Sequence, residues 1–282
     1  MALTGKAKLA GVAGWPVGHS LSPRLHGYWL DLYGIDGAYV PLSIDPKDFP
    51  TVLRTLPKMG FSGTNVTVPH KEAAYQTVDE VTDRARVVKA VNTVIVRPDG
   101  SLLGDNTDGF GFLENLIQRS PGFDPTAGPA VVLGAGGAAR GIIAALLEAG
   151  APEIRLANRT RSRAETLAED IPGAVHVYDV EATEQYLKNA CLFVNTTTLG
   201  MDGQEAEIAD FSALPIDALV TDIVYVPLQT PLLQWAAARG NPTVDGLGML
   251  LHQARPGFEA WFGVVPEVTD DLHQYVLMGL ET

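Results

Sequence analysis

The stretch Ala130-Val131-Val132-Leu133-Gly134-Ala135-Gly136-Gly137-Ala138-Ala139-Arg140 joins an apolar strand pattern directly to a helix pattern. Its spacing, Gly134-x-Gly136-x-x-Ala139, is typical of a turn that binds a dinucleotide. The first glycine permits the tight turn, the second lets a pyrophosphate approach the backbone, and the small third residue allows close packing. The helix N-terminus then offers unpaired N–H groups and partial positive charge to the phosphates. We therefore predict nucleotide binding here, with a glycine turn used only for packing as the alternative.

The next predicted strand, residues 154–157, is followed by Asn158-Arg159-Thr160-Arg161-Ser162-Arg163. An NAD site usually carries an acidic residue roughly 20 residues beyond the glycines, where it binds the ribose 2′-hydroxyl. In this chain that position holds Asn158 and Arg159, and the first acid is Glu165. A carboxylate would repel a 2′-phosphate, whereas a guanidinium group binds it through charge-assisted hydrogen bonds. The sequence therefore favours NADP over NAD, with a solvated basic loop as the alternative.

The composition is that of an ordinary globular protein with an acidic balance. The 282 residues, 46% of them hydrophobic, suit about two domains. The net charge of −13 disfavours nucleic acid as a partner. No apolar run reaches the ~18 residues of a membrane span, and residues 1–8 lack the apolar core of a signal peptide, so we expect a cytoplasmic protein. The single cysteine, Cys191, excludes an internal disulfide and disfavours a cysteine-based metal site.

Strand patterns alternate with helix patterns along most of the chain, which predicts an α/β fold. Around the glycine turn, the alternation predicts a doubly wound parallel sheet of the Rossmann type. We predict a substrate-binding catalytic domain over residues 1–108 and an NADP-binding domain over residues 109–246. C-terminal helices over residues 247–282 are expected to pack back on the first domain. The sequence leaves open whether the chain is a monomer or a homodimer.

Polar residues precede the first helix pattern of the N-terminal half. The segment His19-Ser20-Leu21-Ser22-Pro23 places Ser22 where an N-cap is expected and Pro23 where the helix would begin. Two hydroxyl groups and a histidine at the start of a helix also suit a polyol-binding edge. Local chemistry leaves both interpretations open.

A second polar group follows the third predicted strand. Asn65 and Thr67 lie two residues apart in the predicted strand over residues 63–68, so we expect them to face the same side. Lys71 follows just beyond the strand end, where open α/β sheets place their ligands. Asp108 begins a later helix pattern, where the helix dipole alone favours an acid. A carboxylate there also suits a partner for the Lys71 ammonium, whose proton affinity it would adjust.

These blocks, in this order, make the chain similar to the shikimate dehydrogenases over nearly its whole length. The most specific block is Asn65-Val-Thr-Val-Pro-His-Lys71, and the glycine turn is the least specific. The further blocks are His19–Pro23, Ala90-Val-Asn-Thr93, Asp105-Asn-Thr-Asp-Gly109, Asn158-Arg-Thr160, Asp222-Ile-Val-Tyr225, Thr230-Pro-Leu232 and Gly246-Leu-Gly-Met249 with Gln253.

The resemblance implies reversible reduction of 3-dehydroshikimate to shikimate with NADPH, in aromatic amino-acid biosynthesis and without a metal. It implies that Lys71 and Asp108 are the catalytic pair. The implied substrate-binding residues are Ser20 and Ser22 for the carboxylate, Asn65, Thr67, Asn92, Asp108 and Gln253 for the ring hydroxyls, and Tyr225 along the pocket. The implied cofactor-binding residues are Gly134, Gly136, Gly137, Ala138, Asn158, Arg159, Thr160, Arg163, Gly246 and Met249.

The residue types suit this chemistry on their own. As a hydride reaches a ketone carbon, negative charge develops on the oxygen, and a lysine ammonium can stabilise that charge and supply a proton. Three alternatives stay open: a quinate or dual quinate/shikimate dehydrogenase, a ligand-binding homologue without turnover, and a reductase of an amino-sugar-like analogue in secondary metabolism. The NAD-specific quinate branch tends to carry an acid where this chain has Asn158-Arg159. A pure binding protein has no need of Lys71 together with Asp108.

Overall fold

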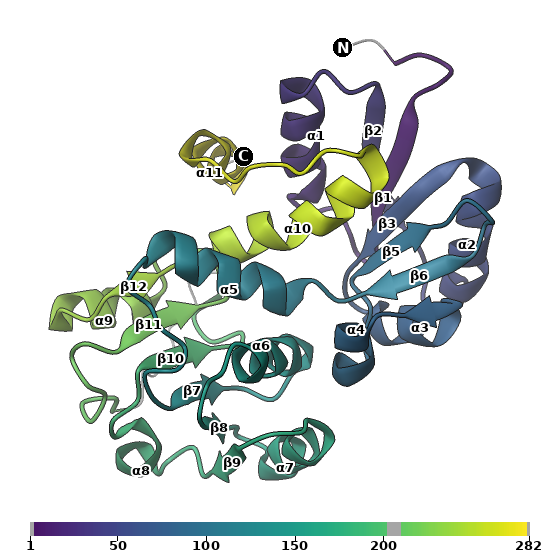
Figure 1. Ribbon diagram of the computed structural model, residues 1–282. Helices are drawn as coiled ribbons and strands as arrows, with labels where there is room; N and C mark the ends of the chain where they lie inside the picture. The colour runs from purple at the N-terminus through teal and green to yellow at the C-terminus, as the bar shows by residue number, and fades with distance from the viewer. Residues whose placement is uncertain (1–2, 202–209, 281–282) are drawn as a thin grey trace. The chain divides into compact units, whose positions relative to one another are not determined.

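The computed structural model describes residues 3–201 and 210–280, which fall into two compact units. The first unit comprises residues 1–107 and 253–282, and the second comprises residues 108–252 (Figure 1). The sequence predicts a boundary at 246/247, where the long helix α10 (Leu247–Phe262) begins, but the division falls inside that helix. Among the described residues, no helix combines the length and apolar character needed to cross a membrane.

The first unit is built on a six-stranded mixed sheet in the order β2-β1-β3-β5-β6-β4. Its strands are β1 (Lys8–Gly14), β2 (Gly37–Ser43), β3 (Phe61–Val66), β4 (Glu80–Val81), β5 (Thr93–Val96) and β6 (Leu102–Asp105). Only β5 runs antiparallel to its neighbours in this sheet. The helices are α1 (Ser22–Leu32), α2 (Phe49–Thr55), α3 (Lys71–Thr77), α4 (Asp83–Val88), the end of α10 and α11 (Asp270–Leu277), with the 3₁₀ turns η1 (Leu56–Met59) and η3 (Met278–Leu280).

Two local predictions in this unit are wrong. Helix α1 begins at Ser22 itself, so Leu21 occupies the N-cap position and no side chain caps the helix. Strand β3 ends at Val66 rather than at residue 68. Thr67 therefore lies just beyond the strand, where its N–H still donates to the Ala13 carbonyl at 2.9 Å.

Aromatic residues from the C-terminal segment complete the core of the first unit. Trp261, which is 2% exposed, donates from its indole Nε1 to the Val94 carbonyl at 3.0 Å. Gly63 on β3 makes room for it, because a Cβ at this position would lie 2.1 Å from that same indole nitrogen. Phe258 packs edge-on against the buried Trp29 of α1, with ring centroids 5.2 Å apart. The end of α10, which carries both residues, thus packs on the N-terminal strands and helices.

The second unit contains a doubly wound parallel sheet, as predicted. Its strand order is β12-β11-β10-β7-β8-β9, and every neighbouring pair is parallel. The strands are β7 (Ala130–Leu133), β8 (Ile154–Ala157), β9 (Val175–Tyr178), β10 (Leu192–Asn195), β11 (Leu219–Asp222) and β12 (Thr243–Val244). The helices are α5 (Asp108–Arg119), α6 (Gly137–Glu148), α7 (Arg161–Asp170), α8 (Thr183–Leu187), α9 (Pro231–Arg239) and the start of α10.

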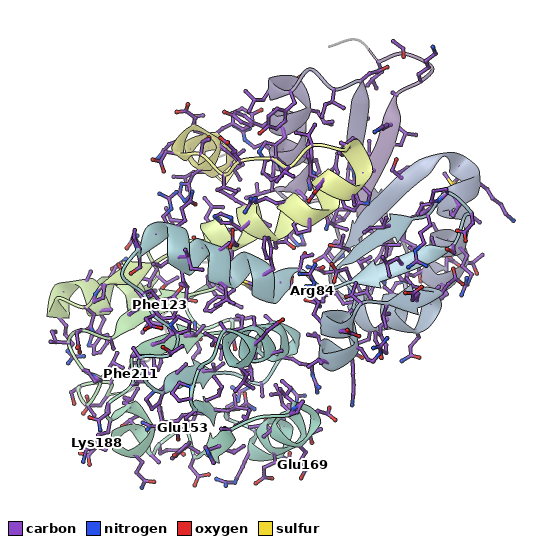
Figure 2. All side chains as sticks on the ribbon, in the orientation of Figure 1. Arg84, Phe123, Glu153, Glu169, Lys188 and Phe211 are labelled. Atoms are coloured by element: carbon purple, nitrogen blue, oxygen red, sulfur yellow. The ribbon has the colours of Figure 1, made fainter. Side chains whose placement is uncertain are left out.

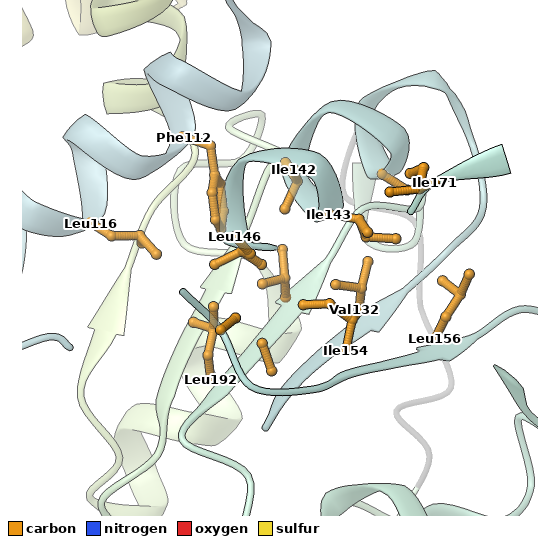
Figure 3. Packing of buried hydrophobic residues seen from close by; sticks show 14 of the residues in the cluster. Phe112, Leu116, Val132, Ile142, Ile143, Leu146, Ile154, Leu156, Ile171 and Leu192 are labelled. Atoms are coloured by element: carbon orange, nitrogen blue, oxygen red, sulfur yellow. The ribbon is translucent and has the colours of Figure 1, made fainter. Parts of the chain in front are cut away.

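Alternate residues of the central strand β7 enter two separate cores. Val132 packs with Ile142 and Leu146 of α6 on one face (Figure 3). Val131 packs with residues of α8 and α9 on the other face. Helices therefore cover both faces of the sheet, and each fully buried aliphatic side chain contributes roughly 1.5–3 kcal/mol of hydrophobic stabilisation.

The strand order reverses between β7 and β10. From β7 the chain proceeds outward through β8 and β9, and then returns to place β10 on the other side of β7. In open α/β sheets, ligands bind outside the carboxyl ends of the strands at such a reversal. Leu133 and Asn195 are the last residues of these two strands. The topology therefore puts a binding site at the glycine turn.

Candidate functional site

The glycine turn adopts the geometry that its sequence predicts. Gly134 has φ +111°, and a Cβ there would lie 2.6 Å from the Thr196 hydroxyl oxygen. Gly136 occupies the N-cap position of α6 in an extended conformation, and Gly137 is the first helical residue. The small third position of the motif, Ala139, is completely buried. The first glycine is thus required by close packing and backbone conformation.

The second glycine faces open space instead. A Cβ built at Gly136 or at Gly137 would meet no atom within 4 Å. Gly136 borders a cavity of about 460 Å³ that lies entirely in the second unit. Its other lining residues are Leu133, Gly134, Ala135, Asn158, Arg159, Arg163, Val180, Tyr186, Asn195, Thr196, Thr197, Thr198, Leu199, Gly200, Pro231, Leu232 and Phe211, the last of which is labelled in Figure 2. The N-terminus of α6 thus borders an open cavity. A pyrophosphate would need the N–H groups of the first and the space of the second.

Two of the three arginines after β8 line this cavity. Arg159 and Arg163 are exposed, and neither has an ion pair among residues 3–201 and 210–280. Arg161 is instead paired with Glu165 and with Asp179. Two uncompensated guanidinium groups at the rim of the cavity can bind a dianionic phosphate.

Asn158 also lines the cavity, and its Nδ2 donates to the Thr160 carbonyl at 2.7 Å. Thr160 itself is exposed and stands outside the cavity lining, as do Gly137 and Ala138 in the first turn of α6. The sequence pointed to these three residues and gave no indication of Thr196 and Thr197 on the opposite wall. The strand pattern that ends at residue 195 could have indicated them, because ligands bind beyond the carboxyl ends of such strands.

The opposite wall is organised by a buried carboxylate. Asp222, which is 0% exposed, accepts hydrogen bonds from the Asn195 amide at 2.9 Å and the Thr230 hydroxyl at 2.8 Å. Asn195 Oδ1 in turn accepts from the N–H and the hydroxyl of Thr197. Burial raises the pKa of Asp222 above its ordinary value, although these hydrogen bonds oppose the shift. Asp222 therefore joins the ends of β10 and β11 to the start of α9.

Three further residues implied by the resemblance lie in the second unit but outside the lining of this cavity. A Cβ at Gly246 would lie 2.5 Å from the Ile223 carbonyl oxygen, so glycine is needed for this close approach. Met249 is partly buried and packs on the same apolar core as Ile223. Burial raises the pKa of the Tyr225 phenol.

In the first unit, amide side chains form a connected network. Asn92 donates from Nδ2 to Gln253 Oε1 at 3.0 Å, and its Oδ1 accepts from the backbone N–H of Thr107 at 2.9 Å. The Thr107 hydroxyl donates to the Gln253 carbonyl at 2.8 Å. Asn65 joins the network through the Asn92 carbonyl at 3.2 Å. The structure thus brings together three of the predicted hydroxyl-binding residues: Asn65, Asn92 and Gln253.

The remaining predicted residues lie at element ends. Ser20 accepts a hydrogen bond from the N–H of Ser22 at 3.3 Å, and Ser22 is 6% exposed. Thr67 is half-buried and lies beside Gly14. A Cβ built at Gly14 would lie 2.6 Å from the Thr67 methyl group. Lys71 is the first residue of α3 in the first unit, and Asp108 is the first residue of α5 in the second. Among the described residues, no cluster of three or more His, Cys, Asp or Glu side chains is placed to hold a metal ion.

Comparisons with known proteins agree with this arrangement. The family model described as the shikimate dehydrogenase substrate-binding domain matches residues 12–94, and the model described as shikimate/quinate 5-dehydrogenase matches residues 123–201. The NADP(+)-dependent shikimate dehydrogenase of Paramagnetospirillum magneticum is 61% identical over 98% of this chain and 100% of its own length.

Solved structures give the same result. Shikimate 5-dehydrogenase from Thermus thermophilus, in complex with NADP(H) and shikimate, superposes with a TM-score of 0.83 and is 36% identical, over 98% of each chain. Quinate dehydrogenase from Corynebacterium glutamicum, in complex with NAD, gives a TM-score of 0.89 and is 32% identical, over 96% of this chain and 99% of its own. With its parallel sheet, glycine turn and polar network in place, the chain belongs to the shikimate dehydrogenase family.

Proposed function

We propose that this chain catalyses the reversible NADP-dependent reduction of 3-dehydroshikimate to shikimate in aromatic amino-acid biosynthesis. The observation that carries the proposal is the cavity at the glycine turn, which is lined by Arg159 and Arg163, two arginines without an ion pair among the described residues. The relative from P. magneticum is named as an NADP(+)-dependent shikimate dehydrogenase. A cytoplasmic location and a monomeric or homodimeric state stay predictions from the sequence.

The residues around the cavity fit NADP. The open space at Gly136 and Gly137 leaves room for the pyrophosphate, and the α6 N-terminus favours its negative charge. Asn158, Arg159 and Arg163 would hold the 2′-phosphate at the rim. When bound, NADPH supplies the hydride. We assign Gly134, Gly137, Ala138 and Thr160 to the same site from the family pattern, and Gly246 and Met249 to the nicotinamide end.

The residues of the first unit would bind the substrate. Ser20 and Ser22 offer hydroxyl donors near the start of α1, which suits a carboxylate. Asn65, Thr67, Asn92 and Gln253 would hydrogen-bond the ring hydroxyls, and Tyr225 would line the pocket. The Asn92 and Gln253 side chains already hydrogen-bond each other, and the Asn65 side chain donates to the backbone carbonyl of Asn92. Such preorganisation lowers the entropy lost on binding.

Lys71 and Asp108 would carry the acid–base chemistry. In the reduction, negative charge develops on the carbonyl oxygen of the substrate, and the Lys71 ammonium stabilises it and donates the proton. In the reverse direction the neutral amine accepts the proton from the hydroxyl. Asp108 would orient the lysine and accept a hydrogen bond from a neighbouring substrate hydroxyl.

One alternative has an observation in its favour, namely the TM-score of 0.89 to an NAD-bound quinate dehydrogenase. Arg159 in the cavity counts against NAD, since an NAD site usually has an acid to bind the ribose hydroxyls. The cofactor cavity does not distinguish quinate from shikimate, because that specificity depends only on the residues that bind the substrate.

Initial rates followed by nicotinamide absorbance, with shikimate and quinate each crossed with NADP and NAD, test the proposal. Activity confined largely to shikimate with NADP is the expected result. Comparable rates with quinate or NAD would place the chain in the dual-specificity branch. Binding of shikimate without turnover in any combination would favour a ligand-binding homologue.

A further inference from the structure

The side chain of Asn65 is fixed by three hydrogen bonds within the first unit. Asn65 is 5% exposed, and its Nδ2 donates to the Asn92 carbonyl and to the Thr93 hydroxyl oxygen, each at 3.2 Å. The Tyr39 hydroxyl donates to Asn65 Oδ1 at 2.6 Å. Both amide hydrogens are therefore used, and one lone pair of Oδ1 is left.

The orientation of this amide follows from its partners. A backbone carbonyl oxygen accepts and cannot donate, so the NH₂ group of Asn65 must face the Asn92 carbonyl. Its Oδ1 then faces Tyr39, whose hydroxyl must be the donor. Thr93 accepts from Asn65 and donates its own hydroxyl hydrogen to Asn92 Oδ1 at 2.9 Å. The hydrogen-bond directions are thus consistent throughout the network.

Tyr39 is itself held rigidly. Its ring stacks on the imidazole of His26 with a centroid separation of 3.8 Å and an interplanar angle of 3°. His26 is fully buried, and neither of its nitrogens has a hydrogen-bond partner among the residues that the structure describes. Burial lowers the pKa of His26 to about 3, although the nearby Asn65 side chain opposes the shift, so the imidazole is neutral at physiological pH.

The Tyr39 hydroxyl remains a donor under all working conditions. Tyr39 is 7% exposed, and burial raises its pKa well above the ordinary value, against the opposing hydrogen bond from the Ser22 side chain. Tyr39 is therefore held as a donor to Asn65, which is assigned to a ring hydroxyl. The sequence pointed to Asn65 and not to the tyrosine that contacts it.

We propose that Tyr39 is a positioning residue that, together with the Asn92 carbonyl and the Thr93 hydroxyl, holds Asn65 as an acceptor-only group. The substrate group that meets Asn65 is then a hydroxyl, which donates, and neither the keto oxygen nor the carboxylate, which only accept. The reacting oxygen of 3-dehydroshikimate is thereby directed away from Asn65. This inference rests on the proposed function, because it concerns the substrate side of the same reaction.

The test is a double-mutant cycle between Tyr39→Phe and Asn65→Ala, measured as KM and kcat for shikimate and KM for NADP. Tyr39→Phe keeps the stacked ring and removes only the hydroxyl. We expect it to raise KM for shikimate about tenfold, to change KM for NADP less than about twofold, and to have much less effect in the Asn65→Ala background. Additive effects of the two substitutions, or equal rises in both KM values, would overturn the proposal.

Tyr28→Phe is the matched control, since Tyr28 belongs to the same unit and its ring contacts Tyr275 rather than Asn65. It should leave both KM values unchanged.

A second measurement avoids any variant of Tyr39: shikimate analogues with one hydroxyl replaced by fluorine are compared in wild type and Asn65→Ala. One position should lose affinity in the wild type and not in Asn65→Ala, because fluorine cannot donate. Equal losses at every position in both proteins would refute the acceptor-only role. An inactive wild type would instead refute the proposed function.

Discussion

Arg161 donates from its Nη1 to the Asp179 carboxylate at 2.6 Å, and from its Nε to Glu165 at 2.8 Å. This pairing neutralises one of three arginines that the sequence places within five residues. Arg159 and Arg163 line the cavity at the glycine turn and have no ion pair with a described residue. Arg161 and Arg163 lie in the first turn of α7 and Arg159 just before it, and the difference in their pairing supplies a matched control.

Arg159→Ala should weaken NADPH binding about 10–100-fold, which corresponds to ~1.4–2.8 kcal/mol, because a charge-assisted contact to the 2′-phosphate is lost. Arg161→Ala should change the Kd for NADPH less than about threefold, since its charge is already compensated. Titration of intrinsic fluorescence measures both. Equal Kd values for wild type and Arg159→Ala would show that Arg159 is merely solvated and does not bind the 2′-phosphate.

Gly134 and Gly136 should respond differently to substitution. Gly134→Ala places a Cβ at φ +111° and against Thr196, so we expect a loss of about 2–3 kcal/mol in the free energy of unfolding. Gly136→Val meets open space in the protein and should lower that free energy by no more than about 1 kcal/mol. Its side chain would fill the place proposed for the pyrophosphate, so NADPH binding should weaken at least tenfold. Urea unfolding and NADPH titration of the two variants separate these effects; an unchanged NADPH Kd in Gly136→Val would argue against the pyrophosphate site.

Lys71→Ala should lower kcat for shikimate oxidation about 10²–10⁴-fold, the usual contribution of a general acid–base group. KM for shikimate should change much less, because the interaction strengthens mainly in the transition state. Lys47→Ala removes an exposed lysine of the same unit, paired with Asp45, and should have no effect. A raised KM with an intact kcat would make Lys71 a binding residue and remove it from the proposed chemistry.

Arg84→Ala should destabilise the first unit in a pH-dependent way. Burial opposes ionisation of Asp105, but hydrogen bonds from Arg84 and Thr82 outweigh it and hold the pKa of this carboxyl below its ordinary value. A depressed carboxyl pKa contributes stability that is present above the unfolded pKa of roughly 3.9 and is lost as the pH falls through the folded pKa.

We therefore expect Arg84→Ala to cost about 2 kcal/mol of unfolding free energy at pH 7, and less as the pH falls below the unfolded pKa of roughly 3.9, as measured by urea denaturation. Arg84 is labelled in Figure 2. The exposed pair of Arg86 with Asp83 offers the control, and Arg86→Ala should cost at most about 0.5 kcal/mol at either pH. A pH-independent effect of Arg84→Ala would assign its role to packing alone.

The sequence by itself determined the elements that depend on local patterns. The strand, glycine turn and helix over residues 130–148 lie where the apolar run and the glycine spacing predict them. Thr230 caps α9 and accepts from the Leu233 N–H, and Gly240 ends the helix with φ +99°, as their residue types predict. These features follow from the sequence because each depends on residues a few positions apart.

Only the tertiary structure decided which polar groups are compensated and how they are oriented. Arg161 meets Asp179, 18 residues away, and Asn65 meets Tyr39, 26 residues away, and no local pattern predicts either contact. Ser22, expected as an N-cap, is instead the first residue of the helix and is buried. The physical reason is that a hydrogen bond or ion pair depends on the packing of distant elements, whereas turns, caps and strand patterns are set by neighbours along the chain.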